Sequence, residues 1–258
     1  MTNADTALDL CLSVIACDNE RTIERTLRSV DGLARRTIVV DSGSKDGTID
    51  LCRACGAEVI AHAWEGHVKQ KQFALEQCDT AWVLSLDSDE SLDETAVRAV
   101  RDAVTGDDPS VAGYEINRRV WYRGRPLRHT WQPEWRTRLV RRDRARWTGH
   151  DPHDRLDVEG TVRRIRGNIR HDSFTDFGEF LRNSVTHGLT TAQSLHEMGK
   201  KGSMLWLLGS PPAAVLKQLL FRSAWLDGLP GWLAAYSAGV HAAVKHVRLL
   251  ELSKQDSE

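Results

Sequence analysis

The sequence has few cysteines, no apolar leader and almost no net charge. Its five cysteines are an odd number and lack the spacing of a disulfide framework, which indicates a reducing compartment. Residues Met1–Leu8 are polar and contain no signal core, so we expect a cytoplasmic protein. Cys52 and Cys55 form a C-x-x-C pair. No second pair completes a zinc site, and we expect both to pack in the core.

Long hydrophobic runs are also missing. The longest charge-free run, Gly228–Val244, has 17 residues and contains Pro230 and His241, whereas a spanning helix needs about 20 residues. Aromatic and basic residues cluster in and around this run: Trp225, Trp232, Tyr236, Lys217, Arg222, Lys245 and Arg248. The pattern favours a segment that lies in a membrane interface. The alternative is a helical subdomain that packs on the core.

The charge is balanced overall but uneven along the chain. The 35 Lys and Arg residues face 36 Asp and Glu residues, giving a formal net charge of −1. Residues 1–116 contain 11 basic and 22 acidic side chains, and residues 117–170 contain 16 and 6. Every cation of the second block is an arginine, which forms planar, bidentate bonds with phosphate. The block predicts either an anion-binding side or an ordinary solvated face.

The first 110 residues alternate strand-like and helix-like segments. The predicted strands are Leu10–Ala16, Thr37–Asp41, Glu58–Ala61 and Ala81–Asp87. Predicted helices follow Asn19 and cover Thr48–Cys55, His67–Cys78 and Asp93–Val104. Repeated βα units indicate an α/β, Rossmann-like fold with a mainly parallel sheet flanked by helices. Ligands of such sheets bind at the carboxyl ends of the strands.

Two of the predicted strands end in carboxylates. Asp87-Ser88-Asp89-Glu90 follows one strand, and carboxylates at i and i+2 can hold a hard divalent cation that bridges the phosphates of a nucleotide. Asp41 ends another strand and precedes a turn and a helix. A carboxylate there can accept hydrogen bonds from a ribose or a base, and the helix N-terminus favours an anion. A D-x-D pair alone is common in acidic turns. The prediction of a nucleotide site therefore depends on both strand ends together.

Three motifs in this order resemble glycosyltransferase family 2, the nucleotide-sugar enzymes with the GT-A fold. They are L-S-V-I-A-C-D-N-E-R-T-I, V-V-D-S-G-S-K-D-G-T and W-V-L-S-L-D-S-D-E, within about Asp9–Val104. The run Trp64–Leu75 is similar to W-x-G-x-x-x-Q-K-N-x-A-L of a short bacterial branch that includes lipopolysaccharide core β-glucosyltransferases. Gln72 stands where that branch usually has Asn.

The resemblance continues beyond the first half. Arg138–Arg142 is similar to the branch's R-L-F-R-R, and Phe221–Gly228 to its F-L-D-G segment. Trp147-Thr148-Gly149 followed by His153-Asp154 is similar to W-x-G-x-x-H-E, with Asp in place of Glu. The carboxylate is therefore one methylene shorter.

This resemblance implies a fold and an activity. We expect a GT-A domain over residues 1–200, with a nucleotide-sugar half (1–110) and an acceptor half (111–200), and a helical extension over 201–258 that contacts the membrane interface. The activity would be an inverting transfer that uses Mg²⁺ or Mn²⁺. The donor would be a nucleoside-diphosphate sugar, most commonly a UDP-sugar. The acceptor would be a hydroxyl of a cell-envelope glycan or glycolipid such as lipopolysaccharide core.

The resemblance and the chemistry together assign site residues. Asp89 is the expected metal ligand, with Asp87 and His153 as further ligands and Asp87 also on the donor sugar or ribose. Lys71 faces the diphosphate, unless it is a solvated helix lysine. The expected nucleoside-binding residues are Asn19, Glu20, Asp41, Ser42 and Gly43. Asp154 is the expected general base, with Asp151 and Glu134 as alternatives. Arg138, Arg141 and Trp135 are expected on the acceptor and diphosphate side.

Two other classes compete with this interpretation. A nucleic-acid-binding protein would use the arginines and tryptophans of residues 117–170, but the acidic first half and the acid-tipped strands argue against a nucleic-acid partner. A sugar nucleotidyltransferase would carry a Gly-rich, basic loop after the first strand, where this chain reads A-C-D-N-E-R.

A phosphorylated, lipid-anchored acceptor would place the enzyme at the cytoplasmic face of the inner membrane.

Overall fold

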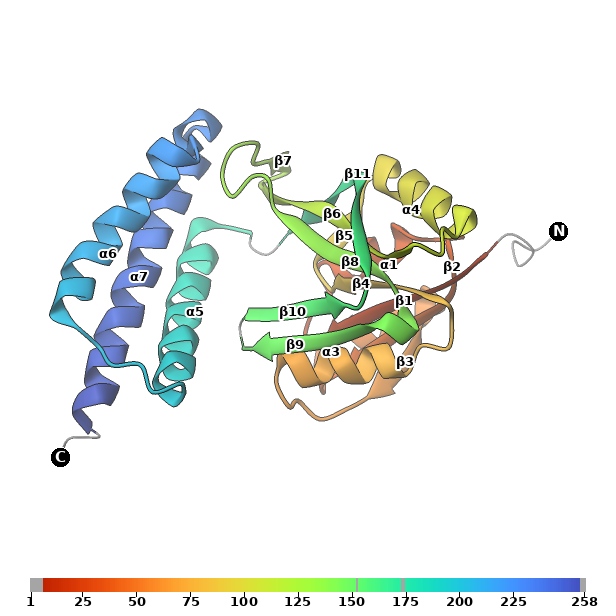
Figure 1. The fold of residues 1–258 in the computed structure, drawn as a ribbon, viewed down its shortest axis with the longest axis horizontal. Coiled ribbons are helices and arrows are strands. Elements are labelled where there is room, and N and C mark those ends of the chain that lie inside the picture. Colours follow the sequence, from red (N-terminus) through yellow and green to blue (C-terminus); the bar gives the residue numbers. More distant parts are fainter. Residues whose placement is uncertain (1–6, 152, 173–174, 256–258) are drawn as a thin grey trace. The chain divides into compact units, whose positions relative to one another are not determined.

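The computed structural model describes residues 7–151, 153–172 and 175–255, and its chain divides into two compact units. The first unit holds the chain up to Arg118, then Glu134–Gly149 and His153–Asp172. The second holds Arg119–Pro133, residues 150 and 151, and the described chain from residue 175 onward. The first contains most of the strands and the second contains the long C-terminal helices (Figure 1).

Four parallel strands form one half of the main sheet. They are β1 (Leu8–Ala16), β2 (Ala34–Asp41), β3 (Glu58–Ala61) and β4 (Trp82–Asp87), in the order β3-β2-β1-β4. In the register, Ala16 lies opposite Asp41 and Ile15 lies opposite Asp87. The two acid-tipped strands therefore end at the same edge of the sheet, as the sequence predicted.

The other half of the main sheet differs from the expected parallel arrangement. It continues from β4 as β8-β6-β11-β5, and β7 pairs with β6. The pairs β4–β8, β8–β6 and β11–β5 are antiparallel, and no helix separates β6 from its partner β8 along the chain. The sheet is therefore mixed. The bounds of these strands are β5 Glu90–Leu92, β6 Val111–Tyr122, β7 Arg125–Pro126, β8 Trp135–Arg141 and β11 Thr161–His171.

Helices and a small hairpin cover the two faces of the sheet. Leu10, Leu12 and Val14 of β1 pack in one core with residues of α1 (Ile23–Arg28), α2 (Thr48–Ala54) and α4 (Glu94–Gly106). Cys11, which points to the opposite face, packs in a second core with α3 (His67–Glu76). Trp147 joins this second core from a hairpin of β9 (Ala145–His150) and β10 (His153–Val158). The predicted helices are thus present on both faces.

The second unit contains α5 (Phe177–Glu197), α6 (Met204–Leu216) and α7 (Leu229–Gln255), with short turns at Lys217–Phe221 and Ala224–Asp227. Small residues bring α5 and α7 together: a Cβ on Gly188 would lie 3.1 Å from the carbonyl oxygen of His241, and Ser184 bonds Ser237. The sequence grouped α5 with the first domain, whereas its packing on α7 places it in the second unit. The functional division at residue 200 stays a prediction.

Candidate active site

Asp41 organises the turn that follows β2. Its side chain is buried, and its Oδ2 accepts hydrogen bonds from the backbone N–H groups of Gly43 (2.8 Å) and Ser44 (2.9 Å). The Ser44 hydroxyl donates to Oδ1. Gly43 has a φ of +98°, which glycine adopts without strain. The carboxylate therefore lies at the predicted strand end, where it holds its own turn in place.

The loop after β1 is tied to the same turn. The Asn19 N–H donates to Thr48 Oγ1 (2.7 Å), and Asn19 Oδ1 accepts from the Cys17 N–H (2.8 Å). Glu20 Oε2 accepts from the Gly47 N–H (2.9 Å). The structure thus brings the residues predicted for the nucleoside into two hydrogen-bonded loops at the carboxyl ends of β1 and β2.

Three consecutive residues of α3 contact three different parts of the first unit. Gln70 is fully buried, and its Nε2 donates to Ser42 Oγ (2.9 Å). Gln72 Oε1 accepts from the Trp147 N–H (2.9 Å). Lys71 lies between them, and successive helical residues point about 100° apart. The Q-K-Q run therefore joins the turn after β2, the end of β4 and the β9 strand.

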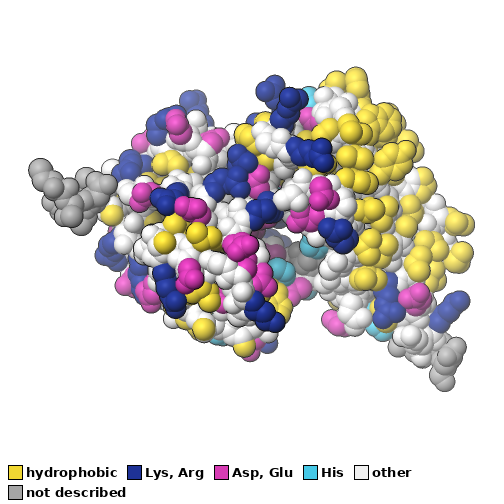
Figure 2. Space-filling model, turned by 180° about the vertical axis from the view of Figure 1, so that it is seen from behind, with side chains coloured by type: hydrophobic (Ala, Val, Ile, Leu, Met, Phe, Trp, Pro, Cys, Tyr) yellow, Lys and Arg dark blue, Asp and Glu magenta, His cyan; other side chains and the backbone are white. Residues whose placement is uncertain are grey.

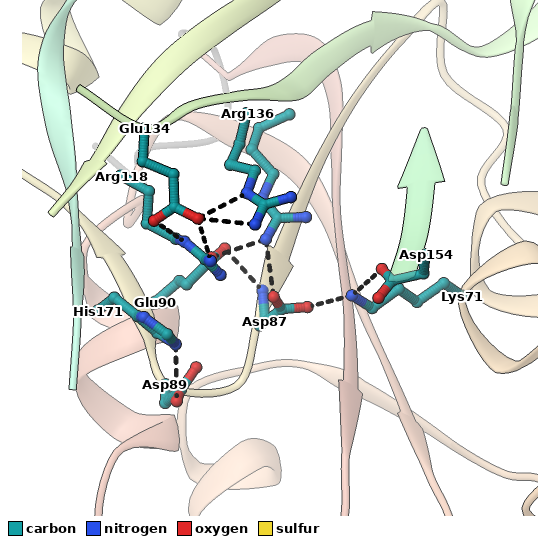
Figure 3. Close-up of polar contacts among 10 residues, drawn as sticks. Lys71, Asp87, Asp89, Glu90, Arg118, Glu134, Arg136, Asp154 and His171 are labelled. Carbon is teal, nitrogen blue, oxygen red and sulfur yellow. Dashed lines mark hydrogen bonds and ion pairs between the residues drawn. The ribbon is translucent and has the colours of Figure 1, made fainter. Parts of the chain in front are cut away.

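Lys71 bridges two carboxylates. Its Nζ lies 2.6 Å from Asp87 Oδ1 and 2.7 Å from Asp154 Oδ2 (Figure 3). The same Nζ lies 4.7 Å from the centroid of the Trp147 ring, within the range of a cation–π interaction. The Lys71 side chain is only 7% exposed. It is therefore not the solvated helix lysine that the sequence left open.

Asp87 is shared between Lys71 and a buried arginine. Arg138 Nη2 donates to Asp87 Oδ2 (2.7 Å) and to Glu90 Oε1 (2.7 Å). Burial alone would raise the pKa of Asp87, but the charges of Arg138 and Lys71 outweigh it and hold the pKa well below its ordinary value. Asp87 is therefore ionised at neutral pH, with a cation on each side.

Glu134 is held by two further arginines. Arg118 donates to both carboxylate oxygens (2.6 and 3.0 Å), and Arg136 donates to Oε1 (2.7 Å). Burial opposes ionisation, but the hydrogen bond and charge of Arg118, with the charge of Arg136, lower the pKa of Glu134 to about 2. Such a carboxylate is a weak proton acceptor at neutral pH. These contacts disfavour Glu134 as an alternative general base, and that role stays a prediction.

Asp89 faces a histidine that the sequence interpretation missed. His171 Nε2 lies 3.3 Å from Asp89 Oδ2, and the Asp172 N–H donates to the Asp89 carbonyl oxygen (3.0 Å). Burial would lower the pKa of His171, but the Asp89 charge outweighs it and raises this pKa. His171 ends β11, so the one available signal was a histidine at the end of the last strand. No local motif connects it with Asp89.

Asp89 and His171 fit a divalent cation as two neighbouring ligands. Carboxylate oxygen and imidazole nitrogen both ligate such ions. Their separation of 3.3 Å is near the roughly 3 Å expected between adjacent ligands of an octahedral Mg²⁺ with bonds of about 2.1 Å. The residues that the structure describes contain no cluster of three or more metal-ligating side chains. The His153 side chain, a predicted ligand, lies outside the described residues.

Three predicted residues lie apart from this cluster. Arg141 pairs with Trp82, at the opposite end of β4 from Asp87, and bonds Asp107; its expected place on the acceptor and diphosphate side is therefore wrong. Trp135 begins β8, and the Arg164 guanidinium lies 4.7 Å from its ring centroid. Asp151 belongs to the second unit, where its carbonyl oxygen accepts from Ser194 (2.7 Å). The roles of Trp135 and Asp151 stay predictions.

Comparisons with known proteins agree on the family. Residues 11–164 match the family described as "Glycosyl transferase family 2". The chain is 27% identical over 256 residues to the lipopolysaccharide core biosynthesis glycosyltransferase LpsC of Rhizobium meliloti, covering 95% of this chain and 93% of LpsC. It is 27% identical over 250 residues to the uncharacterized glycosyltransferase RP128 of Rickettsia prowazekii, covering 93% and 85% of the two chains.

Two solved structures are more distantly similar. TarS of S. aureus is 15% identical with a TM-score of 0.48, covering 96% of this chain and 92% of TarS. Glucosyl-3-phosphoglycerate synthase of Mycobacterium tuberculosis is 20% identical with a TM-score of 0.49, covering 78% and 83%. These likenesses are too distant to say anything about ligands of this chain. The expected α/β class, a GT-A sheet flanked by helices, is confirmed. The chain belongs to glycosyltransferase family 2 and is a glycosyltransferase.

Proposed function

We propose that this glycosyltransferase transfers a sugar from a nucleoside-diphosphate sugar, with uridine as the expected nucleoside, to a hydroxyl of a cell-envelope glycan or glycolipid such as lipopolysaccharide core. The transfer inverts the anomeric centre and depends on Mg²⁺ or Mn²⁺. The observation that carries the proposal is the set of carboxylates at the end of β4, which lies beside Lys71, Arg138 and His171. The name of the relative LpsC supports the acceptor class.

The donor lies along the carboxyl ends of β1, β2 and β4 in this proposal. Asn19, Glu20, Asp41, Ser42 and Gly43 surround the nucleoside, because they form the hydrogen-bonded loops at this edge. The diphosphate lies near Lys71 and Arg138, whose charges stabilise the negative charge that develops on a leaving diphosphate. Lys71 now contacts two carboxylates. It has to exchange one of them for a phosphate oxygen when the donor binds.

Asp89 and His171 hold the cation in this proposal. A divalent cation there would neutralise charge on the leaving diphosphate. Two protein ligands suit Mg²⁺, which is usually bound by one or two carboxylates together with substrate phosphates and water. His171 Nδ1 is buried and has no hydrogen-bond partner among the described residues. As a ligand through Nε2, His171 would be neutral, with its single proton on Nδ1.

Asp154 is the general base in this proposal. An inverting transfer needs a group that takes the proton from the acceptor hydroxyl as the sugar moves. Asp154 lies on β10, and Lys71 connects its carboxylate to Asp87 through contacts of 2.7 and 2.6 Å. A donor held by Asp87 would therefore lie near Asp154. Lys71 also holds the Asp154 carboxylate in place through this 2.7 Å contact.

Sugar transfer from a panel of nucleoside-diphosphate sugars to solubilised core glycolipid tests this function. We expect transfer from one donor class, loss of transfer when EDTA removes divalent metal, and restoration by Mn²⁺ or Mg²⁺. Asp89→Ala should lower kcat/KM at least 100-fold, because one of two cation ligands is lost. Asp102→Ala, at an exposed aspartate of α4, is the control. Transfer that persists in EDTA, or in Asp89→Ala, would contradict the metal role.

The location of the enzyme follows from the proposed acceptor. A glycolipid is anchored in a membrane, and nucleotide sugars are made in the cytoplasm. We therefore place the enzyme at the cytoplasmic face of the inner membrane, in peripheral contact with the bilayer. The 27% identity to LpsC over 95% of this chain supports this assignment.

A further inference from the structure

The second unit exposes a long run of apolar side chains. Met204–Phe221 forms an 18-residue helical stretch with a mean hydropathy of 1.3, and none of it is buried. The exposed leucines and phenylalanine of this stretch are Leu205 (77% exposed), Leu208 (70%), Leu216 (52%), Leu220 (66%) and Phe221 (84%). Figure 2 shows hydrophobic side chains gathered over the helical unit on the face in view. So large an apolar surface marks an interaction site.

The four leucines share one side of this helical stretch. Leu205, Leu208, Leu216 and Leu220 are separated by multiples of three or four residues, the spacing of neighbours along a helix face. We call these four residues the outer face of α6, although Leu220 lies in the short turn that follows the helix. α6 also packs on α7: a Cβ on Gly239 would lie 2.8 Å from Val215 Cγ2. The outer face is thus left over after α6 has packed within its own unit.

The segment that carries the outer face is basic between Glu197 and Asp227. Residues 198–226 contain Lys200, Lys201, Lys217 and Arg222 and no Asp or Glu. An apolar face bordered by cations is the pattern of helices that bind anionic lipid surfaces. A protein partner would more often present a mixed, complementary charge pattern. The absence of acids therefore favours an anionic bilayer as the occupant.

Exposed aromatic side chains continue the surface. They are Trp206 (62% exposed), Trp225 (53%), Trp232 (46%) and Tyr236 (60%). Trp and Tyr favour the level of the lipid headgroups, because their rings are apolar and carry one polar atom. Aromatics on α6, on the turn after it and on α7 indicate a broad contact with the interface.

The helix lies along the bilayer rather than across it. Eighteen residues span about 27 Å at 1.5 Å per residue, close to the roughly 30 Å of hydrocarbon. However, α6 packs against α7, which carries Lys245, Arg248, Glu251 and Lys254. A spanning α6 would draw these charges into hydrocarbon at a high cost. A flat orientation buries only the outer face.

We propose that the outer face of α6, with the exposed tryptophans around it, lies flat in the interface of an anionic phospholipid bilayer. This proposal deepens the proposed function, since it names the surface that meets the membrane of a lipid-anchored acceptor. The contact itself needs no donor, acceptor or metal. Membrane binding and sugar transfer can therefore fail independently of each other.

Flotation of the full chain with vesicles tests the surface. We expect binding to phosphatidylglycerol–phosphatidylcholine vesicles at least tenfold stronger than to pure phosphatidylcholine, with a decrease at high salt. Leu205→Glu/Leu208→Glu should weaken vesicle binding at least tenfold, whereas Val162→Glu, at an exposed valine of β11 (38%), should leave it unchanged. Equal circular-dichroism spectra of the variants show that the fold is kept. A double variant that floats like the wild type would overturn the proposal.

The depth of Trp206 tests the orientation. Lipids brominated near the headgroup should quench the Trp206 fluorescence more than lipids brominated near the bilayer centre. The chain has nine tryptophans. Comparison of the wild type with Trp206→Phe therefore isolates the fluorescence that comes from Trp206. Stronger quenching from the bilayer centre would overturn the flat orientation.

A second copy of the chain is the main alternative occupant. Sedimentation of the wild type in lipid-free buffer should show no self-association through this face. The wild type and Leu205→Glu/Leu208→Glu should therefore sediment alike. A dimer that this variant dissociates, together with no flotation of the wild type, would assign the outer face to self-association and overturn the proposal. Sugar transfer to a detergent-solubilised acceptor, measured on the same variant, should be kept. Its loss there would be a failure of the proposed function instead.

Discussion

Lys71 is the residue on which the candidate site depends most directly. It is 7% exposed and contacts Asp87 and Asp154 at 2.6 and 2.7 Å. A buried cation between two carboxylates neutralises charges that would otherwise repel each other. The site is therefore organised before any ligand binds, and a preorganised charge cluster is what stabilisation of a leaving diphosphate requires.

Removing the charge of Lys71 should abolish transfer. Lys71→Met keeps most of the side-chain length and leaves Asp87 and Asp154 without their shared cation. We expect kcat/KM to fall at least 100-fold and Tm to fall by a few degrees. Lys69→Met, two residues away at a 70% exposed lysine, is the matched control and should leave both unchanged. Equal kcat/KM in the two variants would show that Lys71 has no part in the reaction.

At the residue scale, sequence reasoning located most of the candidate site. Asp41, Asp87 and Lys71 were found because each follows a strand end or lies within a short motif. His171 was missed because its link to Asp89 depends on the pairing of β11 with β5, where His171 lies opposite Glu90. Arg141 was misplaced because the R-L-V-R-R motif does not reveal the direction of its strand. That direction decides which end of the sheet an arginine reaches.

At the scale of elements, ion pairs join β6 and β8 near the site. Arg118 lies on β6, and Glu134 directly precedes β8, which carries Arg136 and Arg138. These side chains form a chain of contacts that ends at Asp87 (Figure 3). The arginines that the sequence identified as an anion-binding block thus serve in part as structural partners of carboxylates.

The Glu134 contacts should stabilise the fold in a pH-dependent way. The folded-state pKa of about 2 lies below the ordinary 4.5, so the ionised group stabilises the fold above about pH 4.5 and loses this contribution as pH falls toward 2. Glu134→Gln should lower the free energy of unfolding at pH 7 by about 3 kcal/mol. The difference from wild type should vanish near pH 2.

Urea unfolding between pH 7 and pH 2 measures this difference. Glu94→Gln, at a 93% exposed glutamate of α4, is the control and should track the wild type throughout. A Glu134→Gln variant as stable as wild type at pH 7 would show that the two arginines contribute nothing net.

The parallel half of the sheet was predictable and the antiparallel half was not. Apolar runs with short helical segments between them describe β1 to β4 and their connections almost completely. Beyond residue 110, arginines and tryptophans obscure the alternation of the strands. The pairing order β8-β6-β11-β5 depends on contacts between residues as distant as Leu92 and Ile169. Local periodicity carries no information about such pairs.

At the scale of the whole molecule, the net charge of −1 is the sum of the opposite charges of different regions. Carboxylates dominate residues 1–116, and arginines dominate residues 117–170. The helical unit carries a basic, apolar face that we assign to the membrane. The charge distribution argued against a nucleic-acid partner but did not identify an activity. The family match over residues 11–164 identifies an enzyme.

The most direct test of the account is nucleotide binding at the end of β4, measured as a thermal shift. We predict that one nucleoside diphosphate of the UDP, GDP, ADP and CDP panel raises Tm by several degrees, and only with Mn²⁺ or Mg²⁺ present. A ligand at a hundredfold excess over Kd stabilises a fold by about 2.7 kcal/mol. Asp89→Ala and His171→Ala should lose this metal-dependent rise, and Asp102→Ala should keep it. A rise of equal size in Asp89→Ala, or none with any nucleotide and metal, would contradict the account.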